Sequence, residues 1–271
     1  MKKNIILMAF AVAALAACEK SVPYEPGAPM NLDNPNVYFS AYNSNKTVLA
    51  SDATEFEVAI LRDDVETALT LPLNSACSYE GIFTVPETVE FPAGVDSVSF
   101  KVQVSDKIEM FKDYQLTLTI PEEFTHAYIP SETTGPRYIA NVIKEDYAPY
   151  ATGQYYDLFW SEALSPNVLE YSPLKDEYRL ANVWGTGVSL TFTWDRAEKV
   201  KLGADKYATG LVHPSYGAIT ANVVGATYSH FEAGQLFENI ACDAFYFNFK
   251  WTVSAGSFGE YPNLFIVEKV L

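Results

Sequence analysis

Apolar and polar residues alternate with a period of two through most of this chain from Val37 onward. Residues 56–60, 98–104 and 116–120 each carry an apolar side chain at every second position. Successive side chains of a strand point to opposite faces of a sheet, so this pattern buries one face and leaves the other in water. We therefore expect an all-β protein built from antiparallel sheets.

Shorter apolar runs complete seven or eight strands between residues 37 and 144. They lie at residues 37–39, 69–73, 82–85, 88–91 and 138–143. Pro72 cannot donate a hydrogen bond to a neighbouring strand, which places its strand at a sheet edge. Many short strands separated by turns predict a β-sandwich.

The segment from Phe83 to Gly94, FTVPETVEFPAG, is followed by two alternating strands at residues 98–104 and 115–120. This order resembles the second half of a Calx-β domain, and the resemblance extends over residues 37–144. It implies an immunoglobulin-like sandwich. Some members of that family bind Ca²⁺ through acidic residues at strand ends.

The acidic positions of this chain favour a version of the Calx-β fold without calcium. Where the family has an acidic pair after the penultimate strand, this sequence reads Asp106-Lys107. A lysine in that place repels the cation and removes a coordinating oxygen. Asp63 and Asp64 could supply oxygens, but adjacent loop carboxylates are usually just solvated. We expect no metal site and no cofactor.

Residues 145–152, with Pro149, interrupt the alternation and are the expected linker to a second domain at residues 153–271. All four tryptophans lie beyond this point. Residues 188–194 and 245–253 alternate as strands with aromatic stripes, which favour a core over a binding site. Residues 255–259, AGSFG, are expected to form a turn before a last strand at 264–268. The prediction is therefore two antiparallel β-sandwich-like domains.

Several segments of the second half resemble a C-terminal module of uncharacterised Bacteroidetes cell-envelope lipoproteins. In those proteins a G-x-Y strand opens a small β-domain and an aromatic strand leading to AGSFG closes it. The corresponding segments here are residues 153–156, 178–180, 184–187 and 245–259. The resemblance implies an envelope location and a β-fold, and it carries over no catalytic residue.

The chain begins with Lys2 and Lys3, followed by an uncharged run from Ile5 to Ala17. A spanning helix needs about 20 apolar residues, so this run fits the centre of a signal peptide instead. Leu15-Ala16-Ala17-Cys18 resembles the lipobox of bacterial lipoproteins. That resemblance implies cleavage after residue 17 and lipids on Cys18, which would anchor the protein to the outer membrane. The alternative is an ordinary secretory signal with a coincidental cysteine.

Residues 18–36 contain four prolines and several asparagines, a composition typical of an extended tether. Loss of Lys2 and Lys3 with the signal peptide changes the formal net charge from −16 to −18. Such a charge argues against nucleic acid as a partner and against docking on an anionic bilayer through a basic patch. Glu19-Lys20 leaves open whether the anchored protein faces the periplasm or the cell surface.

The sequence contains no residue set that names a reaction. Residues 256–259, GSFG, do not form a nucleophile elbow, and Gly185-Thr186-Gly187 lacks the lysine of a phosphate loop. Acidic residues are numerous, but nothing selects a pair for glycoside hydrolysis. If Cys18 carries lipid, Cys77 and Cys242 remain, either as two thiols or as a disulfide.

Aromatic residues in turns offer the best candidates for a ligand site, because sugars stack on exposed rings. The candidates are Trp160, Tyr178, Trp184 and Tyr216. The alternative for both tryptophans is that they plug the ends of the sandwich. The preferred function is a non-catalytic binding or accessory module for glycans, and an envelope protein complex is the other candidate partner. The alternative is a structural or adhesive protein, and a hydrolase comes third.

Overall fold

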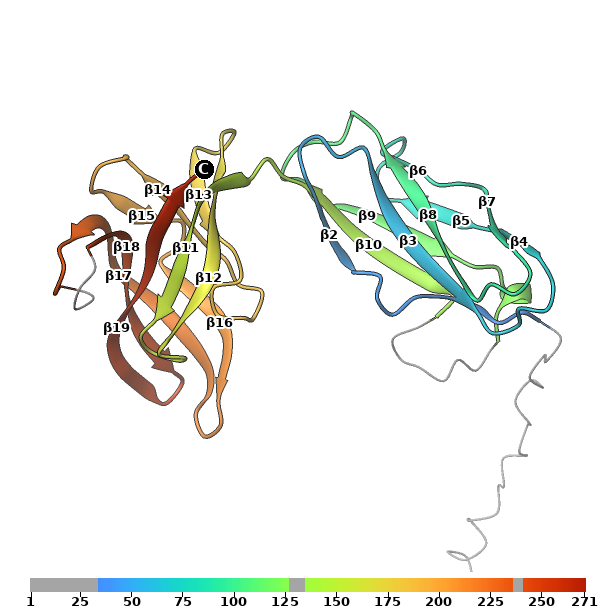
Figure 1. Cartoon of the computed structure of the whole chain (residues 1–271). Helices are drawn as coiled ribbons and strands as arrows, with labels where there is room; N and C mark the ends of the chain where they lie inside the picture. Colours follow the sequence, from blue (N-terminus) through green and yellow to red (C-terminus); the bar gives the residue numbers. More distant parts are fainter. Residues whose placement is uncertain (1–33, 127–134, 236–240) are drawn as a thin grey trace, which may run out of the picture.

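The computed structural model describes residues 34–126, 135–235 and 241–271. Within these residues the chain forms strands and a single short 3₁₀ turn, η2 (Glu122–Phe124), so the predicted all-β class is confirmed. Figure 1 shows two bodies joined by one crossing of the chain, a first region that ends with β10 and a second that begins with β11.

The first region is made of ten strands in two four-stranded sheets and one two-stranded sheet. The orders are β1-β3-β8-β6, β2-β10-β9-β5 and β4-β7. All neighbouring pairs are antiparallel except β2 and β10, which run parallel. The strands are β1 (Val37–Phe39), β2 (Lys46–Leu49), β3 (Glu55–Arg62), β4 (Leu69–Pro72), β5 (Asn74–Cys77), β6 (Phe83–Thr84), β7 (Thr88–Phe91), β8 (Ser97–Val104), β9 (Tyr114–Thr119) and β10 (Arg137–Lys144).

The two larger sheets of the first region bury a mostly aliphatic core between them. Alternate residues of β3 and β8, among them Val58, Ile60 and Val102, are fully buried. Leu118 of β9 and Val142 of β10 belong to the same core. Because the buried positions are those that the period of two selects, the pattern in the sequence accounts for this sandwich.

The structure adds two strands to the predicted set, β2 and β5. Both occupy the outer edges of their sheet. Pro72 lies in β4, which pairs only with β7, as the prediction of an edge strand required.

The connection between the regions is shorter than the predicted linker of residues 145–152. Only residues 145–147 lie outside strands, because β11 (Ala148–Asp157) already begins at Ala148. Pro149 takes part in this strand and marks the place where the register with β12 shifts. The proline therefore produces a strand irregularity and not a longer linker.

The second region is one nine-stranded antiparallel sheet, in the order β15-β14-β13-β12-β11-β19-β18-β17-β16. The sheet curls until β15 lies beside β17, where the amide of Tyr228 donates to the carbonyl of Glu198 at 3.1 Å. Its two facing layers therefore belong to one continuous sheet. The remaining strands are β12 (Ala163–Ser172), β13 (Glu177–Leu180), β14 (Leu190–Trp194), β15 (Val200–Leu202), β16 (Lys206–His213), β17 (Gly217–Phe231), β18 (Cys242–Val253) and β19 (Gly256–Val270).

An aromatic core fills the inside of the curled sheet. Phe245, Phe247, Phe249 and Trp251 alternate along β18, and all four are buried. Gly153 of β11 lets two backbones approach, because a Cβ there would lie 2.0 Å from the carbonyl oxygen of Ile266. The aromatic stripe of β18 is thus core, as its alternation predicted.

The predicted turn at residues 255–259 is wrong in extent. Only residues 254 and 255 form the turn, and β19 begins at Gly256. Gly256 and Gly259 adopt positive φ angles of 155° and 107° at the start of this strand, so the glycines permit its bend.

Several predictions concern residues outside the described part of the chain. Cys18, the signal peptide and nearly all of the tether lie there. Among the residues that are described, no helix is long and apolar enough to cross a bilayer. Cys77 in β5 and Cys242 in β18 are both free thiols.

Candidate functional site: a cleft lined by two tryptophans

A cleft of about 650 Å³ opens on the second region beside β12. Its wall comes from the end of β11 and the turn after it, from β12, and from the turn that joins β13 to β14. The lining residues are Asp157, Trp160, Ser161, Ala163, Ser165, Pro166, Asn167, Val168, Glu170, Ala181, Asn182, Val183, Trp184 and Gly185. The structure thus brings Trp160 and Trp184, two of the four predicted residues, to one cavity.

Trp160 is held in the turn after β11 by the side chain of Asp157. One carboxylate oxygen of Asp157 accepts hydrogen bonds from the backbone amides of Phe159, at 2.9 Å, and of Trp160, at 3.1 Å. Such a bond from a side chain to the backbone two residues on is the usual device of an Asx-turn. The indole of Trp160 stays 41% exposed, so part of it is free to contact a ligand.

Trp184 lies in the turn between β13 and β14, but its side chain points into the protein and is only 8% exposed. Its ring packs edge-on against Tyr207, Phe249 and Trp251. The amide of Gly187 donates to the side-chain oxygen of Asn182 at 2.6 Å, which closes the turn. Trp184 therefore acts mainly as the predicted plug, while one edge of its ring still lines the cleft.

Three buried polar groups lie together at Trp184. They are the Trp184 indole N–H, the Tyr155 hydroxyl and the Asn263 amide, none of which makes a well-formed hydrogen bond within the described residues. Burial raises the pKa of Tyr155 well above 10, and the charge of Asp157 adds to this, whereas Asn263 and Trp184 act in the opposite direction. Packing against the three aromatic rings fixes the indole of Trp184.

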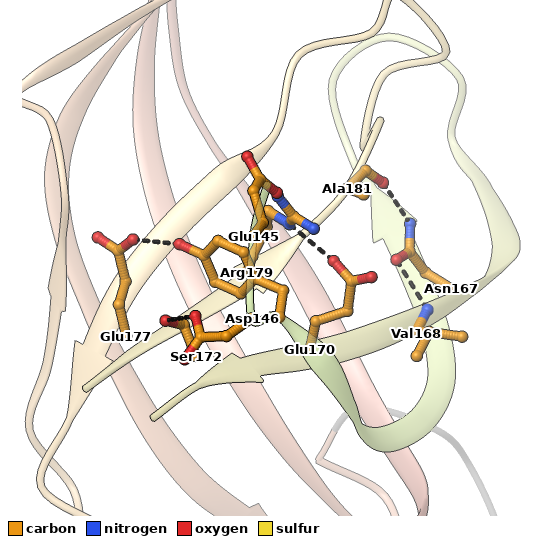
Figure 2. A network of polar contacts seen from close by, with 10 residues as sticks. Glu145, Asp146, Asn167, Val168, Glu170, Ser172, Glu177, Arg179 and Ala181 are labelled. Carbon is orange, nitrogen blue, oxygen red and sulfur yellow. Dashed lines mark hydrogen bonds and ion pairs between the residues drawn. The ribbon is translucent and has the colours of Figure 1, made fainter. Parts of the chain in front are cut away.

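Asn167 of β12 supplies an amide side chain that is fixed in place at the cleft. Its Nδ2 donates to the carbonyl of Ala181 at 3.1 Å, and its Oδ1 accepts from the amide of Val168 at 2.8 Å (Figure 2). Because the amide is held at both ends, it offers its remaining hydrogen-bonding capacity in a defined direction. This is the arrangement that orients hydroxyl groups of a ligand.

Glu170, also on the cleft wall, is neutralised by Arg179 of β13. The guanidinium Nε of Arg179 lies 2.7 Å from Glu170, and its other arm pairs with Glu145 of the connection between the regions (Figure 2). Burial alone would lower the pKa of Arg179, but the bonds to Glu170 and Glu145 raise it above its ordinary value. Arg179 thus joins the cleft wall to the segment that enters from the first region.

Two cationic side chains lie over aromatic rings near the same connection. The guanidinium carbon of Arg179 lies 3.8 Å from the ring centre of Tyr147, and Nζ of Lys175 lies 4.0 Å from that of Phe111. Phe111 belongs to the first region, and its φ of 61° is unusual for a bulky residue. Tyr147 also donates its hydroxyl to Glu177. These contacts hold the entry to β11.

Tyr178 and Tyr216 do not join the cleft. Tyr178 is 1% exposed, and its ring packs against Tyr150, Tyr171 and Phe192, so the expected exposed ring is absent. The physical reason is that Tyr178 is in phase with Leu180 on the inner face of β13. Tyr216 lies in the β16–β17 turn and is 50% exposed, as expected.

Four further residues of the cleft, Asp157, Asn167, Glu170 and Asn182, were not predicted. An aspartate two residues before an aromatic pair is a turn signal that could have indicated Asp157. Both carboxylates of the cleft already serve structural contacts, Asp157 with two backbone amides and Glu170 with Arg179. The described residues contain no cluster of three or more histidine, cysteine, aspartate and glutamate side chains that could hold a metal ion.

Comparisons with known proteins give only distant structural similarities. No protein-family model matches the sequence. No curated protein matches it either. Among solved structures, the apo form of a Calx CBD1 domain is 20% identical with a TM-score of 0.32, and the match covers 41% of this chain and 97% of that one.

Two longer structures are similar over most of the chain. CBD12 from CALX1.2 is 16% identical with a TM-score of 0.34, over 81% of this chain and 82% of that one. A multidomain protein from Bacteroides ovatus that includes DUF1735 is 11% identical with a TM-score of 0.32, over 86% and 93%. At such scores the architecture rests on the strand pairing of this chain itself, and function must be argued from the cleft.

Proposed function

We propose that this protein is a non-catalytic, lipid-anchored module of the bacterial cell envelope whose cleft at Trp160 binds a glycan. One observation carries the proposal: an exposed indole stands in a cleft of about 650 Å³ beside amide side chains fixed in direction. A sugar has apolar faces that stack on such a ring and hydroxyls that such amides orient. The anchor rests on Cys18 and the lipobox-like residues before it.

A glycan array probed with residues 19–271 tests the binding role directly. We expect binding to at least one neutral polysaccharide. A chain that binds none of the polysaccharides on the array would contradict the proposal and leave the structural or adhesive role in its place.

Substitution at the two tryptophans separates a binding role from a structural one. Trp160→Ala should abolish binding with little change in melting temperature, because the ring is only partly buried, with 41% of it exposed. Trp184→Ala should lower the free energy of unfolding by about 3–5 kcal/mol, the usual cost of emptying a buried aromatic site. Tyr42→Ala is the matched control, since Tyr42 is an exposed ring of the first region. Unchanged binding in Trp160→Ala would remove the cleft from the proposal.

The anchor is tested separately with Cys18→Ser in the full chain. We expect the variant to leave the membrane fraction and to lose metabolic labelling with a fatty acid, since two or more acyl chains are needed for stable attachment. A variant that stays with the membrane and carries no label would contradict the anchor and leave the glycan proposal untouched.

A further inference from the structure

A chain of aromatic rings leads away from the cleft across the surface of the second region. The ring of Trp160 lies 6.3 Å from that of Phe159, Phe159 lies 5.5 Å from Phe258, and Phe258 lies 6.1 Å from Tyr216, measured between ring centres. These four residues are called the aromatic track. They come from three separate turns or strand ends, so the curl of the sheet brings them together.

The aromatic track connects two hollows. Trp160 lines the cleft of about 650 Å³, and Phe258 and Tyr216 line a second hollow of about 310 Å³ with Val253, Ala255, Gly256 and Ser257. Trp160 and Tyr216 at its two ends are both exposed, and Phe159 and Phe258 between them are partly exposed. A row of rings that are exposed or partly exposed marks an interaction surface more often than an isolated apolar side chain does.

Two further rings pack against the aromatic track. Phe159 stacks on the buried ring of Trp251, with centres 4.3 Å apart and planes 19° apart. The His213 ring stacks against Tyr216 at 4.7 Å. These contacts hold the rings in place before a ligand arrives, which lowers the entropic cost of binding.

Charge limits the class of ligand that fits this surface. The residues that line the two hollows, all within the described chain, include Asp157 and Glu170 but no lysine and no arginine. Arg179 pairs with Glu170, but it is shared with Glu145, so it leaves no excess positive charge at the cleft. The whole chain is also strongly acidic, with a formal charge of −16. Uronic acids or sulfated sugars would therefore meet repulsion without a counter-charge, whereas a neutral sugar would not.

We infer that the cleft, the aromatic track and the hollow at Tyr216 form one extended site for a linear, uncharged polysaccharide. Consecutive sugar units would stack along Trp160, Phe159, Phe258 and Tyr216. This inference rests on the proposed function and deepens it, because it specifies the length and charge of the ligand. Trp160 binds the first sugar units, and Tyr216 contributes only when the polysaccharide is long enough to reach it.

Calorimetric titration with neutral oligosaccharides of increasing length tests the inference. The probes are di-, tetra- and hexasaccharides of the gluco-, xylo- and manno-series, added to residues 19–271. We expect the affinity to rise at least tenfold from disaccharide to hexasaccharide in one series. Tyr216→Ala should lower the affinity for the hexasaccharide about tenfold and leave the disaccharide unchanged, and Tyr42→Ala should change neither.

The outcomes separate the extended site from the glycan cleft. Equal affinity for short and long oligosaccharides, or a Tyr216→Ala variant indistinguishable from Tyr42→Ala, would overturn the extended site while the glycan cleft stands. Tight binding of a uronic acid oligomer would overturn the restriction to uncharged chains. If no oligosaccharide and no polysaccharide on the array binds, the proposed function fails and the extended site fails with it.

Discussion

The two regions of this protein solve the same packing problem with different side chains. The first encloses Val, Ile and Leu residues between two separate sheets, whereas the second wraps one sheet around phenylalanine, tyrosine and tryptophan rings. Tyrosine and tryptophan bring polar atoms into a core with them. In the described chain, the buried side-chain atoms without a hydrogen-bond partner belong to Tyr155, Tyr178, Trp184 and Asn263 of the second region, and only to His126 of the first. An aromatic core thus buries polar atoms, and one of them, the indole N–H of Trp184, belongs to a residue that lines the cleft.

The largest effect that we expect comes from emptying one core at a time. Phe247→Ala in the second region should lower the free energy of unfolding by about 3–5 kcal/mol, and Ile60→Ala in the first by about 2–5 kcal/mol. All four tryptophans lie in the second region, so tryptophan fluorescence reports its unfolding alone. Far-ultraviolet circular dichroism reports both regions. Phe247→Ala should shift the fluorescence transition and Ile60→Ala should not. Equal shifts of that transition by both variants would show that the regions unfold as one unit.

The junction between the regions should be the next most sensitive place. Arg179→Met leaves Glu145 and Glu170 without their shared partner, and we expect a loss of about 3 kcal/mol in denaturant unfolding followed by tryptophan fluorescence. Arg179→Lys keeps the charge but cannot reach both carboxylates with a planar fork. Its stability should therefore lie between those of Arg179→Met and the wild type. If Arg179→Met is as stable as the wild type, the ion pairs contribute nothing net.

The turn that carries Trp160 should show a smaller effect. Asp157→Ala removes the acceptor of two backbone amides, which should cost about 1–3 kcal/mol of stability and weaken glycan binding. Asp157→Asn retains a side-chain oxygen in the same place and should retain most of both. Melting temperature and titration on the same preparations give the comparison. Equal loss in Asp157→Asn would assign the role to the charge of Asp157 and not to the turn.

Alkaline pH should destabilise the second region, and this is the smallest of the expected effects. Burial raises the pKa of Tyr155, Tyr178 and Tyr207 in the second region above the ordinary 10.0 of tyrosine. The folded state therefore keeps protons that the unfolded chain releases near pH 10. This stabilisation is present in full below pH 10 and is lost as the pH rises toward the folded pKa values. The denaturant midpoint seen by fluorescence should fall above pH 10, and a flat midpoint there would contradict the shifts.

Alternation in the sequence predicted the strands that bury one face and missed those that do not. β3, β8, β9 and β18 were predicted from their period of two, because each has one side in a core. β2 (KTVL) and β5 (NSAC) lie at sheet edges and bury little, so their sequences carry no such period and only their neighbours make them strands.

The site was predictable in part. Trp160 and Tyr216 were selected because turns expose large rings, and both are exposed. Trp184 was equally well placed in a turn, yet its ring turns inward onto Trp251, a contact that no local pattern contains. Asn167 and Glu170 become part of the cleft only because β12 lies beside β13, and strand neighbours are set by the whole fold.

The parallel pairing of β2 with β10 has a mechanical consequence. The chain enters the first region at Asn34, whose side chain is bound to the carbonyl of Thr125, and leaves it at Glu145, beyond the far end of β10. A pull between these two points acts along β2 and β10 in opposite directions, so the strands are sheared and not peeled apart. The pairs from Asn141–Lys46 to Lys144–Leu49 must then break together. The parallel pair therefore resists tension applied between residues 34 and 145.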